Sequence, residues 1–345
     1  MTVSKKFSPE RSEGGSIDAP PLGFRWSLHF LQGDYANRNL LFSTFSLMSG
    51  TIRFAPSPTG YLHEGHLLSA LYVWAAAKKW DMKVHLRIED HDQGRARKEY
   101  IDSIYEDLAW LGFKYDSESI QSTRFDFYQR ILEKLDALGL VYPCTCSRKQ
   151  LLAENPRSET GEVIYQGKCR PIQSNRETPH SLRVVIPDKV IDWHDERLGD
   201  FHENPKLQCG DFPIRDRDGY WTYQFAVCID DLTQGISHIV RGEDILNSTA
   251  RQIALSQMIA DACTGDASLQ VPAYTRPLYL HHPLIVDGSG KKLSKREHAH
   301  SLRQDKEAGI TPEALFGRVL FKAKLQESDL PTPLEDALGQ IIRTL

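Results

Sequence analysis

Long apolar runs are missing from this sequence. No segment approaches the roughly 20 consecutive apolar residues that a membrane-spanning helix needs, and the basic start is not followed by the roughly 7–15-residue apolar core of a signal peptide. Positive charge is not in excess either, since the formal net charge is −4. We therefore expect a protein that does not enter a membrane, and any contact with nucleic acid must depend on a local basic surface.

Cysteine is scarce, with six residues in 345. That is too few for a disulfide scaffold, and it indicates a reducing compartment such as the cytoplasm. Three of the six cluster as Cys144, Cys146 and Cys169. Cysteines at i and i+2, with a third beyond a loop, can converge on a tetrahedral metal ion, and buried free cysteines are the alternative.

The composition is otherwise ordinary for a globular protein, with 40% hydrophobic and 26% charged residues. At 345 residues the chain is long enough for one large or two small domains. Residues 1–47 differ from the rest because they are rich in Ser, Gly, Pro and Glu, a composition typical of disorder. We expect a poorly ordered N-terminal extension or a start assigned too early, with Met48 in the position of a start.

The segment TIRFAPSPTGYLHEGH, from Thr51 to His66, predicts a strand, a turn and the beginning of a helix. Residues 52–55 are a short strand-like run, and two prolines and a glycine over residues 56–60 indicate a turn. Residues 67–80, rich in Ala and Leu, predict a buried helix.

This layout puts His63 and His66 at a helix N-terminus. The unpaired N–H groups and the dipole of a helix attract anions there. Two imidazoles separated by Gly65, which permits close approach, suit a polyphosphate. Histidines with a purely structural role are the alternative.

A second notable segment is GSGKKLSKR, residues 288–296, which is rich in glycine and carries four cations within residues 291–296. Its usual interpretation is a solvated charge run. It is not a P-loop, because Ile285 and Lys292 stand where that motif needs Gly and Ser or Thr.

Together, HEGH and KLSKR resemble HIGH and KMSKS, the two signature sequences of class I aminoacyl-tRNA synthetases, although Glu64, Leu293 and Arg296 depart from them. The RFAPSPTG segment before HEGH narrows the resemblance to the glutamyl and glutaminyl branch. The resemblance covers roughly residues 51–300. It implies an α/β fold: a Rossmann-like catalytic domain with a parallel sheet, an inserted zinc-bearing subdomain and a short helical C-terminal tail.

The resemblance also implies a reaction in which a glutamate carboxylate attacks the α-phosphate of ATP. In this interpretation His63 and His66 contact the phosphates, as ATP-binding and catalytic residues. Lys295 neutralises charge on the leaving pyrophosphate, with help from Lys292. Mg²⁺ is implied as the companion of ATP.

Strand ends supply candidate groups for the amino-acid substrate. Residues 83–88 predict a strand that ends before Glu89, and residues 237–241 predict another that ends at Arg241. Open α/β sheets bind ligands at these carboxyl ends. Arg53 and Arg241 can each grip a carboxylate, although either can instead form a structural ion pair. Two arginines and Glu89 together fit a zwitterion with an extra carboxylate, which is glutamate.

The resemblance assigns the substrate ammonium group to Glu89 and a substrate contact to Tyr223. It adds four consecutive residues to the glutamate-binding set, namely Phe54, Ala55, Pro56 and Ser57. Periodicity does not decide whether residues 220–231, which include Tyr223, form a strand or a buried helix. The resemblance implies a helix.

The cysteine cluster matches a pattern of the short glutamyl-synthetase paralogues, CxC followed by YxxxC. This match implies one structural Zn²⁺ per chain, held by Cys144, Cys146, Tyr165 and Cys169. Four filled positions leave none for a substrate. The residues alone leave the fourth ligand open.

After KLSKR only residues 297–345 follow, with helices expected over 301–324 and 334–345. That is too little for the anticodon-reading domain of full glutamyl-tRNA synthetases. The short tail and the zinc pattern are both typical of the paralogues that attach glutamate to the queuosine base of tRNA(Asp). We therefore expect ATP, L-glutamate and tRNA(Asp) as partners of a cytoplasmic monomer.

The expected domain organisation has five parts along the chain: an extension (1–47), the first half of the nucleotide-binding catalytic domain (48–143), a zinc-bearing insertion (144–190), the second half with KLSKR (191–297) and a helical tail (298–345). Three other functions stay open. They are a truncated glutamyl-tRNA synthetase that acylates a tRNA 3′ end, another HxGH nucleotidyltransferase that makes a small dinucleotide, and a non-catalytic tRNA-binding relative.

Overall fold

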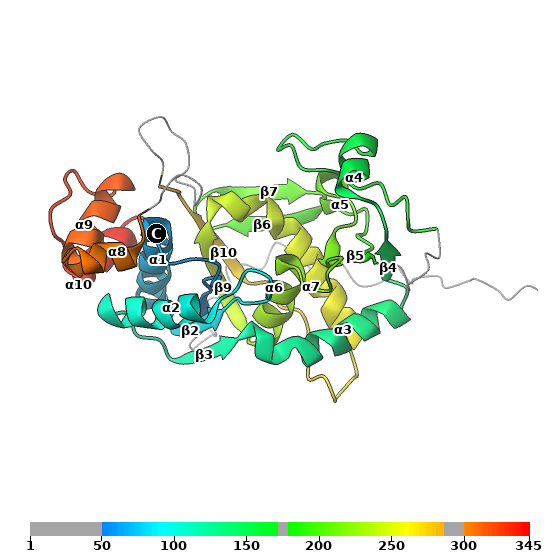
Figure 1. The fold of residues 1–345 in the computed structure, drawn as a ribbon, viewed down its shortest axis with the longest axis horizontal. Helices are drawn as coiled ribbons and strands as arrows, with labels where there is room; N and C mark the ends of the chain where they lie inside the picture. The colour runs from blue at the N-terminus through cyan, green and yellow to red at the C-terminus, as the bar shows by residue number, and fades with distance from the viewer. Residues whose placement is uncertain (1–49, 172–178, 286–299) are drawn as a thin grey trace, which may run out of the picture. The chain divides into compact units, whose positions relative to one another are not determined.

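The computed structural model describes residues 50–171, 179–285 and 300–345 (Figure 1). The expected extension, residues 1–47, and the KLSKR segment lie outside the described residues, so those expectations are not tested. None of the helices within the three ranges is both long and apolar enough to cross a membrane.

A sheet of seven strands forms the centre of the described structure, in the order β3-β2-β1-β9-β10-β6-β7. Neighbouring strands pair in parallel from β3 to β6, and β7 pairs antiparallel with β6 at the edge. The mostly parallel α/β fold predicted from the sequence is therefore confirmed. The strands are β1 (Thr51–Phe54), β2 (Lys83–Ile88), β3 (Ser117–Ile120), β6 (Ile191–Asp195), β7 (Gly199–Glu203), β9 (Ile236–Gly242) and β10 (Leu278–His282).

The strand order reverses between β1 and β9. From β1 the chain moves outward to β2 and β3, and it later returns to β9 on the other side of β1. In open α/β sheets, ligands bind outside the carboxyl ends of the strands at such a reversal point. Phe54 and Gly242 end the two strands that flank it.

Helices cover both faces of the sheet. Successive strand residues face opposite sides, and in β9 Val240 packs into the core with α1 whereas Ile239 packs with α7. Figure 1 shows the C-terminal helices beside α1. The helices that pack with Val240 in one hydrophobic core are α1 (Glu64–Trp80), α2 (Lys98–Trp110), α8 (Leu302–Glu307), α9 (Pro312–Lys322) and α10 (Leu334–Ile342). Another hydrophobic core holds α3 (Phe125–Ala137), α6 (Tyr223–Thr233) and α7 (Thr249–Cys263).

The strands of a small antiparallel sheet, β4-β5-β8, alternate along the chain with those of the large one: β4 and β5 come before β6 and β7, and β8 comes after them. The Cys144–Cys169 segment begins at its first strand. Its strands are β4 (Val141–Cys144), β5 (Ser181–Val184) and β8 (Pro213–Arg215), and the short helices nearby in sequence are α4 (Arg148–Glu154) and α5 (Pro205–Gln208). Two 3-10 turns, η2 (Gln121–Arg124) and η3 (Glu243–Ser248), complete the described elements.

The structure answers two questions of secondary structure. The sequence pattern left one of them open and gave the wrong answer to the other. Residues 220–231, ambiguous in periodicity, are largely helical, because α6 spans Tyr223–Thr233. The single helix expected over residues 301–324 is wrong. Two helices, α8 and α9, stand there, and Gly309, whose φ is +76, lies in the break between them.

Candidate active site

The two histidines of HEGH cap the N-terminus of α1. His63 is the N-cap residue, and its Nδ1 accepts a hydrogen bond from the Gly65 amide at 3.1 Å. The His63 amide donates in turn to Nδ1 of His66, also at 3.1 Å, and the ring centroids are 4.0 Å apart. Because each Nδ1 accepts, each neutral ring carries its proton on Nε2. Both imidazoles can then donate from Nε2 to an anion at the helix N-terminus.

Glu64, the acidic residue where the signature sequence has an apolar one, contacts the C-terminal helix α9. Its Oε1 lies 2.8 Å from Nε of Arg318, and its Oε2 lies 2.6 Å from Nζ of Lys322. Arg318 also pairs with Asp305 of α8 at 2.7 Å. The departure of Glu64 from the signature sequence therefore has a structural reason, because its carboxylate connects the first turn of α1 to α9.

A pocket of about 150 Å³ opens at the reversal point of the sheet. Drug-sized ligands occupy roughly 300–1,000 Å³, so this volume suits a smaller molecule such as an amino acid. Its walls come from the ends of β1 and β9, the residue after β2, and the starts of α1 and α6. The lining residues are Arg53, Phe54, Ala55, Pro56, His66, Ser69, Val73, Glu89, Tyr223, Val240, Arg241, Gly242 and Ile245.

A buried ion network lies behind one side of the pocket. Asp231 of α6 accepts from Nε of Arg53 at 3.0 Å and from a terminal nitrogen of Arg87 at 2.6 Å. Arg87, which is fully buried, also reaches Glu89 at 3.3 Å. Burial opposes ionisation of Asp231, but the two arginines outweigh it and lower the pKa of that carboxyl. Burial raises the pKa of Glu89, so a cation in the pocket would stabilise its ionised form.

Arg241, on the other side of the pocket, has three partners. Its Nε donates to Nε2 of His281 at 2.9 Å, and its terminal nitrogens donate to Gln252 at 2.5 Å and Thr249 at 2.7 Å. Gln252 and Thr249 belong to α7, so bonds to α7 and to His281 together fix the plane of the guanidinium. A planar guanidinium in a fixed orientation is suited to a carboxylate.

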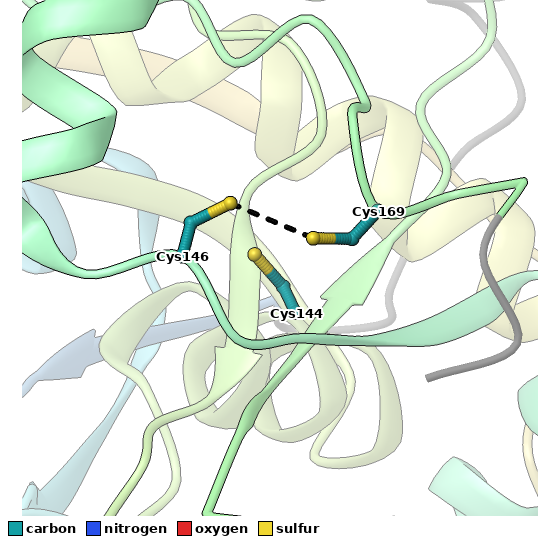
Figure 2. Close-up of side chains that lie close together, drawn as sticks. All are labelled: Cys144, Cys146 and Cys169. Carbon is teal, nitrogen blue, oxygen red and sulfur yellow. Dashed lines mark hydrogen bonds between the residues drawn. The ribbon is translucent and has the colours of Figure 1, made fainter. Parts of the chain in front are cut away.

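The cysteine cluster lies in the small-sheet region, and none of its residues lines this pocket. Figure 2 shows the sulfur atoms of Cys144, Cys146 and Cys169 facing one another, and all three lie within 4.8 Å of each other. The Cys146 and Cys169 sulfurs are 3.5 Å apart, close to the roughly 3.8 Å between two thiolates on one tetrahedral zinc. The described thiols can therefore hold a metal ion.

The hydroxyl of Tyr165 meets the same three cysteines. It lies 3.5 Å from the Cys144 sulfur and 3.7 Å from the Cys146 sulfur, and it accepts from the Cys169 amide at 3.0 Å. Gly210 makes this placement possible, because a Cβ there would lie 2.0 Å from the Tyr165 carbonyl oxygen. The backbone therefore holds the phenol hydroxyl next to the three cysteines.

Comparison with known proteins bears directly on this arrangement. The family described as "tRNA synthetases class I (E and Q), catalytic domain" matches residues 51–326. The chain belongs to this family. Its pocket, its HEGH turn and its mostly parallel sheet are thus parts of a class I synthetase catalytic domain.

Relatives of two lengths occur within this synthetase family. The "Glutamyl-Q tRNA(Asp) synthetase" of Nitratidesulfovibrio vulgaris is 35% identical over 305 residues, which cover 83% of this chain and 90% of that protein. The "Glutamate--tRNA ligase" of Legionella pneumophila is 38% identical over 275 residues, and the match covers 78% of this chain but 55% of that protein. The solved glutamate-tRNA synthetase from Elizabethkingia anophelis superposes with a TM-score of 0.65 at 27% identity, covering 84% of this chain and 65% of that one.

Most of the site residues expected from the sequence come together in the structure. Those that line the pocket are Arg53, Phe54, Ala55, Pro56, His66, Glu89, Tyr223 and Arg241. Ser57 follows in the turn, and His63 contacts His66 beside the pocket. Lys292 and Lys295 lie outside the described residues.

The described residues on either side of the KLSKR segment lie near the pocket. Before it, His282 ends β10 in register with Gly242, a lining residue. After it, Ser301 forms a β-bridge with His63, and the Leu302 amide donates to the Leu62 carbonyl at 2.8 Å. The chain therefore leaves and re-enters the described structure at this site.

Several residues that hold the site were missed by the sequence reasoning. Arg87 sits in a strand whose alternation predicts an exposed polar face, yet it is 0% exposed. Asp231, Thr249 and Gln252 contact the two pocket arginines from distant helices. The one available signal was the Asp230-Asp231 pair in a largely apolar segment, because buried carboxylates need partners.

Proposed function

We propose that this enzyme uses ATP to activate L-glutamate as glutamyl-adenylate and transfers the glutamyl group to the queuosine base of tRNA(Asp). One observation carries the proposal. Arg53, Arg241, Glu89 and Tyr223 line a single small pocket that also receives His66 from the helix N-terminus. An amino-acid site thus adjoins a phosphate site, as adenylate formation requires.

The charges around the pocket favour glutamate. Among the described residues that line it or bond to lining groups, three are arginines (Arg53, Arg87 and Arg241) and two are carboxylates (Glu89 and Asp231). This leaves one positive charge in excess, which matches the net negative charge of glutamate. The substrate ammonium group would face Glu89, and its two carboxylates would face Arg53 and Arg241.

Adenylate formation follows from in-line attack. A carboxylate oxygen of glutamate bonds to the α-phosphorus of ATP, and the bond from that phosphorus to the bridging oxygen breaks, which releases pyrophosphate. The protein contributes orientation and charge stabilisation. His63 and His66 donate from Nε2 to phosphate oxygens, and Lys295, aided by Lys292, neutralises the leaving pyrophosphate. ATP would enter with Mg²⁺.

The choice of acceptor rests on the relatives whose names specify it. Proteins named "Glutamyl-Q tRNA(Asp) synthetase" match this chain at 35–38% identity over 83–85% of its length. We therefore favour the queuosine base over a tRNA 3′ end.

Product mapping tests this choice. The enzyme is incubated with ATP, labelled glutamate and three tRNAs: queuosine-containing tRNA(Asp), the same tRNA lacking queuosine, and tRNA(Glu). We expect label only in the first, at the anticodon. Label at the 3′ end of tRNA(Glu) would identify a truncated glutamyl-tRNA synthetase. ATP turnover without glutamate would favour a dinucleotide-forming nucleotidyltransferase, and no turnover would favour a non-catalytic tRNA-binding protein.

The cysteine cluster is proposed as a structural zinc site. Three thiols and the Tyr165 hydroxyl fit a tetrahedral ion, with Cys144, Cys146, Cys169 and Tyr165 as ligands. Burial opposes ionisation of Cys144, yet hydrogen bonds from Tyr165 and Arg183 outweigh it and lower the pKa of this thiol to about 7. With four protein ligands the ion would hold the insertion together and would bind no substrate.

A further inference from the structure

A buried chain of polar groups lies directly behind Arg241. Nε of Arg241 donates to Nε2 of His281 at 2.9 Å, and Nδ1 of His281 lies 2.6 Å from Oδ2 of Asp195. His281 and Asp195 are both 0% exposed. Each group is bonded to the next, so the orientation of the guanidinium depends on groups that do not line the pocket.

We infer that His281 and Asp195 are positioning residues that set the orientation of the Arg241 guanidinium and thereby the affinity for glutamate. This inference rests on the proposed function, because it assigns a glutamate carboxylate to Arg241. Neither residue lines the pocket. Their effect must therefore pass through Arg241.

The partners fix the tautomer of His281. The Nε–H of Arg241 can only donate, so Nε2 of His281 must be an unprotonated acceptor. The Thr249 hydroxyl, which accepts from Arg241, lies 3.3 Å from the same Nε2. The ring proton therefore resides on Nδ1 and is donated to Asp195. Burial supports the neutral ring, since it lowers the pKa of His281 to about 4.

Asp195 is itself held rigidly. Its Oδ1 accepts from the Arg197 and Leu198 amides at 3.1 and 3.0 Å, and its Oδ2 accepts from the His281 amide at 3.0 Å. These bonds fix the carboxylate at the end of β6, against the turn that leads to β7. A fixed carboxylate then fixes the imidazole in one tautomer and one rotation, which is the role that a carboxylate behind a histidine commonly plays.

The remaining geometry leaves Arg241 able to bind a substrate. A guanidinium has five N–H donors, and three are directed at His281, Gln252 and Thr249. A carboxylate in the pocket would take up N–H groups beyond those three. Because the Nε bond to His281 and the two bonds to α7 together set the plane of the fork, loss of the Nε bond would tilt the donors offered to the substrate.

The neighbouring His282 does not share this role. Adjacent strand residues face opposite sides of a sheet, and the His282 ring stacks on Tyr72 of α1 at 5.0 Å.

Two substitutions at one position test the inference. His281→Leu and His281→Gln both remove the imidazole from Asp195, but the Gln carbonyl can still accept from Arg241. In glutamate-dependent ATP–pyrophosphate exchange we expect the KM for glutamate to rise about tenfold or more in His281→Leu, as for a lost bond to a charged group. It should stay within about threefold of wild type in His281→Gln. The KM for ATP should not change in either.

Asp195→Asn tests the second link. An amide nitrogen facing Nδ1 would donate to it and move the ring proton to Nε2, opposite the Nε–H of Arg241. We expect the KM for glutamate to rise while the KM for ATP stays constant, and this variant replaces His281→Leu if the latter does not fold. His238→Gln, a histidine on β9 bonded to Ser237 and packed on Trp80, is the control with wild-type kinetics.

The outcomes separate the two proposals. Wild-type enzyme without glutamate-dependent exchange would overturn the proposed function. Active wild type with an unchanged KM for glutamate in His281→Leu and Asp195→Asn would overturn this inference alone. Equal rises in the KM for glutamate and for ATP, or no rescue by His281→Gln, would show a merely structural role and would also overturn it.

Discussion

At the scale of single residues, Gly65 shows how closely the HEGH turn is packed. A Cβ at this position would lie 3.0 Å from Cε1 of His63 and 3.2 Å from its Nδ1. The glycine is therefore required by the neighbouring imidazole and not by an unusual backbone angle. The sequence predicted a close-approach glycine between two phosphate-binding histidines, and the structure supplies the side chain that it approaches.

Gly65→Ala should shift the His63 ring by a few tenths of an ångström and slow pyrophosphate exchange. We expect kcat to fall on the order of tenfold, since misplacement of a catalytic group by about 1 Å can cost 100-fold. The KM for glutamate should change little because Arg53 and Glu89 are untouched. Gly60→Ala is the matched control, as a Cβ at Gly60 meets nothing within 4 Å. Equal kinetics in the two variants would contradict this account.

Asp107 of α2 offers a second test at the level of one residue. It is 2% exposed, and its Oδ2 accepts a hydrogen bond from the Ser103 hydroxyl at 3.4 Å. Burial raises the pKa of this carboxyl from 3.8 to about 6. Between these two pH values the folded protein binds a proton that the unfolded chain has lost, so the free energy of unfolding decreases as pH rises from about 4 to about 6.

Asp107→Asn should remove this pH dependence from the free energy of unfolding. We expect the variant to be more stable than wild type by about 1–3 kcal/mol at pH 7.5 and to differ little at pH 4. Urea unfolding at the two pH values measures both differences. A variant that is less stable at pH 7.5, or that keeps the wild-type slope, would show that Asp107 is stabilised in its ionised form.

At the scale of elements, alternation in residues 83–88 predicted β2 with its observed bounds but not its surroundings. His85 and Arg87 look like the solvent face of the strand, yet both are buried. The sheet is covered on both sides, so the polar face must find partners inside: Ser117 and Ser119 for His85, and Asp231 for Arg87. Periodicity reports which residues share a face, and it does not report what covers that face.

The link between α1 and α9 gives an element-scale prediction. Glu64→Leu restores an apolar residue at the signature position but leaves Arg318 and Lys322 without their carboxylate partner. We expect a loss of about 1–3 kcal/mol in unfolding free energy, because the partly buried Glu64 carboxylate accepts charged hydrogen bonds from Lys322 and forms an ion pair with Arg318. Chemical denaturation measures it.

A double-mutant cycle with Arg318→Leu provides the control for Glu64→Leu. If the two side chains interact as the structure shows, the double variant should lose less than the sum of the single losses. Additive losses, or a Glu64→Leu variant as stable as wild type, would mean that the pair does not hold the tail.

At the scale of the whole molecule, the sequence predicted the fold class and named the arginines and the glutamate that line the pocket, but not the groups that support them. Motif segments such as RFAPSPTG are contiguous, so their residues could be assigned together. Asp231 lies 178 positions from Arg53, and His281 lies 40 from Arg241. Only the topology of the sheet brings such pairs together, and no local pattern encodes it.

The separation of the two sheets predicts that metal and substrate binding are independent. Cys146→Ser should lower the zinc content from one equivalent per chain and reduce the thermal midpoint, because a structural metal stabilises the fold that holds it. The KM for glutamate should stay at the wild-type value in protein that remains folded. Metal analysis and exchange kinetics check the two statements.

Cys263→Ala is the matched control for Cys146→Ser, since Cys263 is a buried free cysteine outside the cluster. It should retain the full metal content. Zinc retained by Cys146→Ser, or a loss of glutamate affinity as large as the loss of metal, would contradict the assignment.

The central claim is that one site joins glutamate to the α-phosphate of ATP. Its most direct test is ATP–pyrophosphate exchange by the purified full-length chain in the presence of Mg²⁺ and without tRNA. We predict exchange that requires L-glutamate, is not supported by L-glutamine and is lost in Arg241→Ala. Exchange that proceeds equally without an amino acid, or none with glutamate at any concentration, would contradict the account.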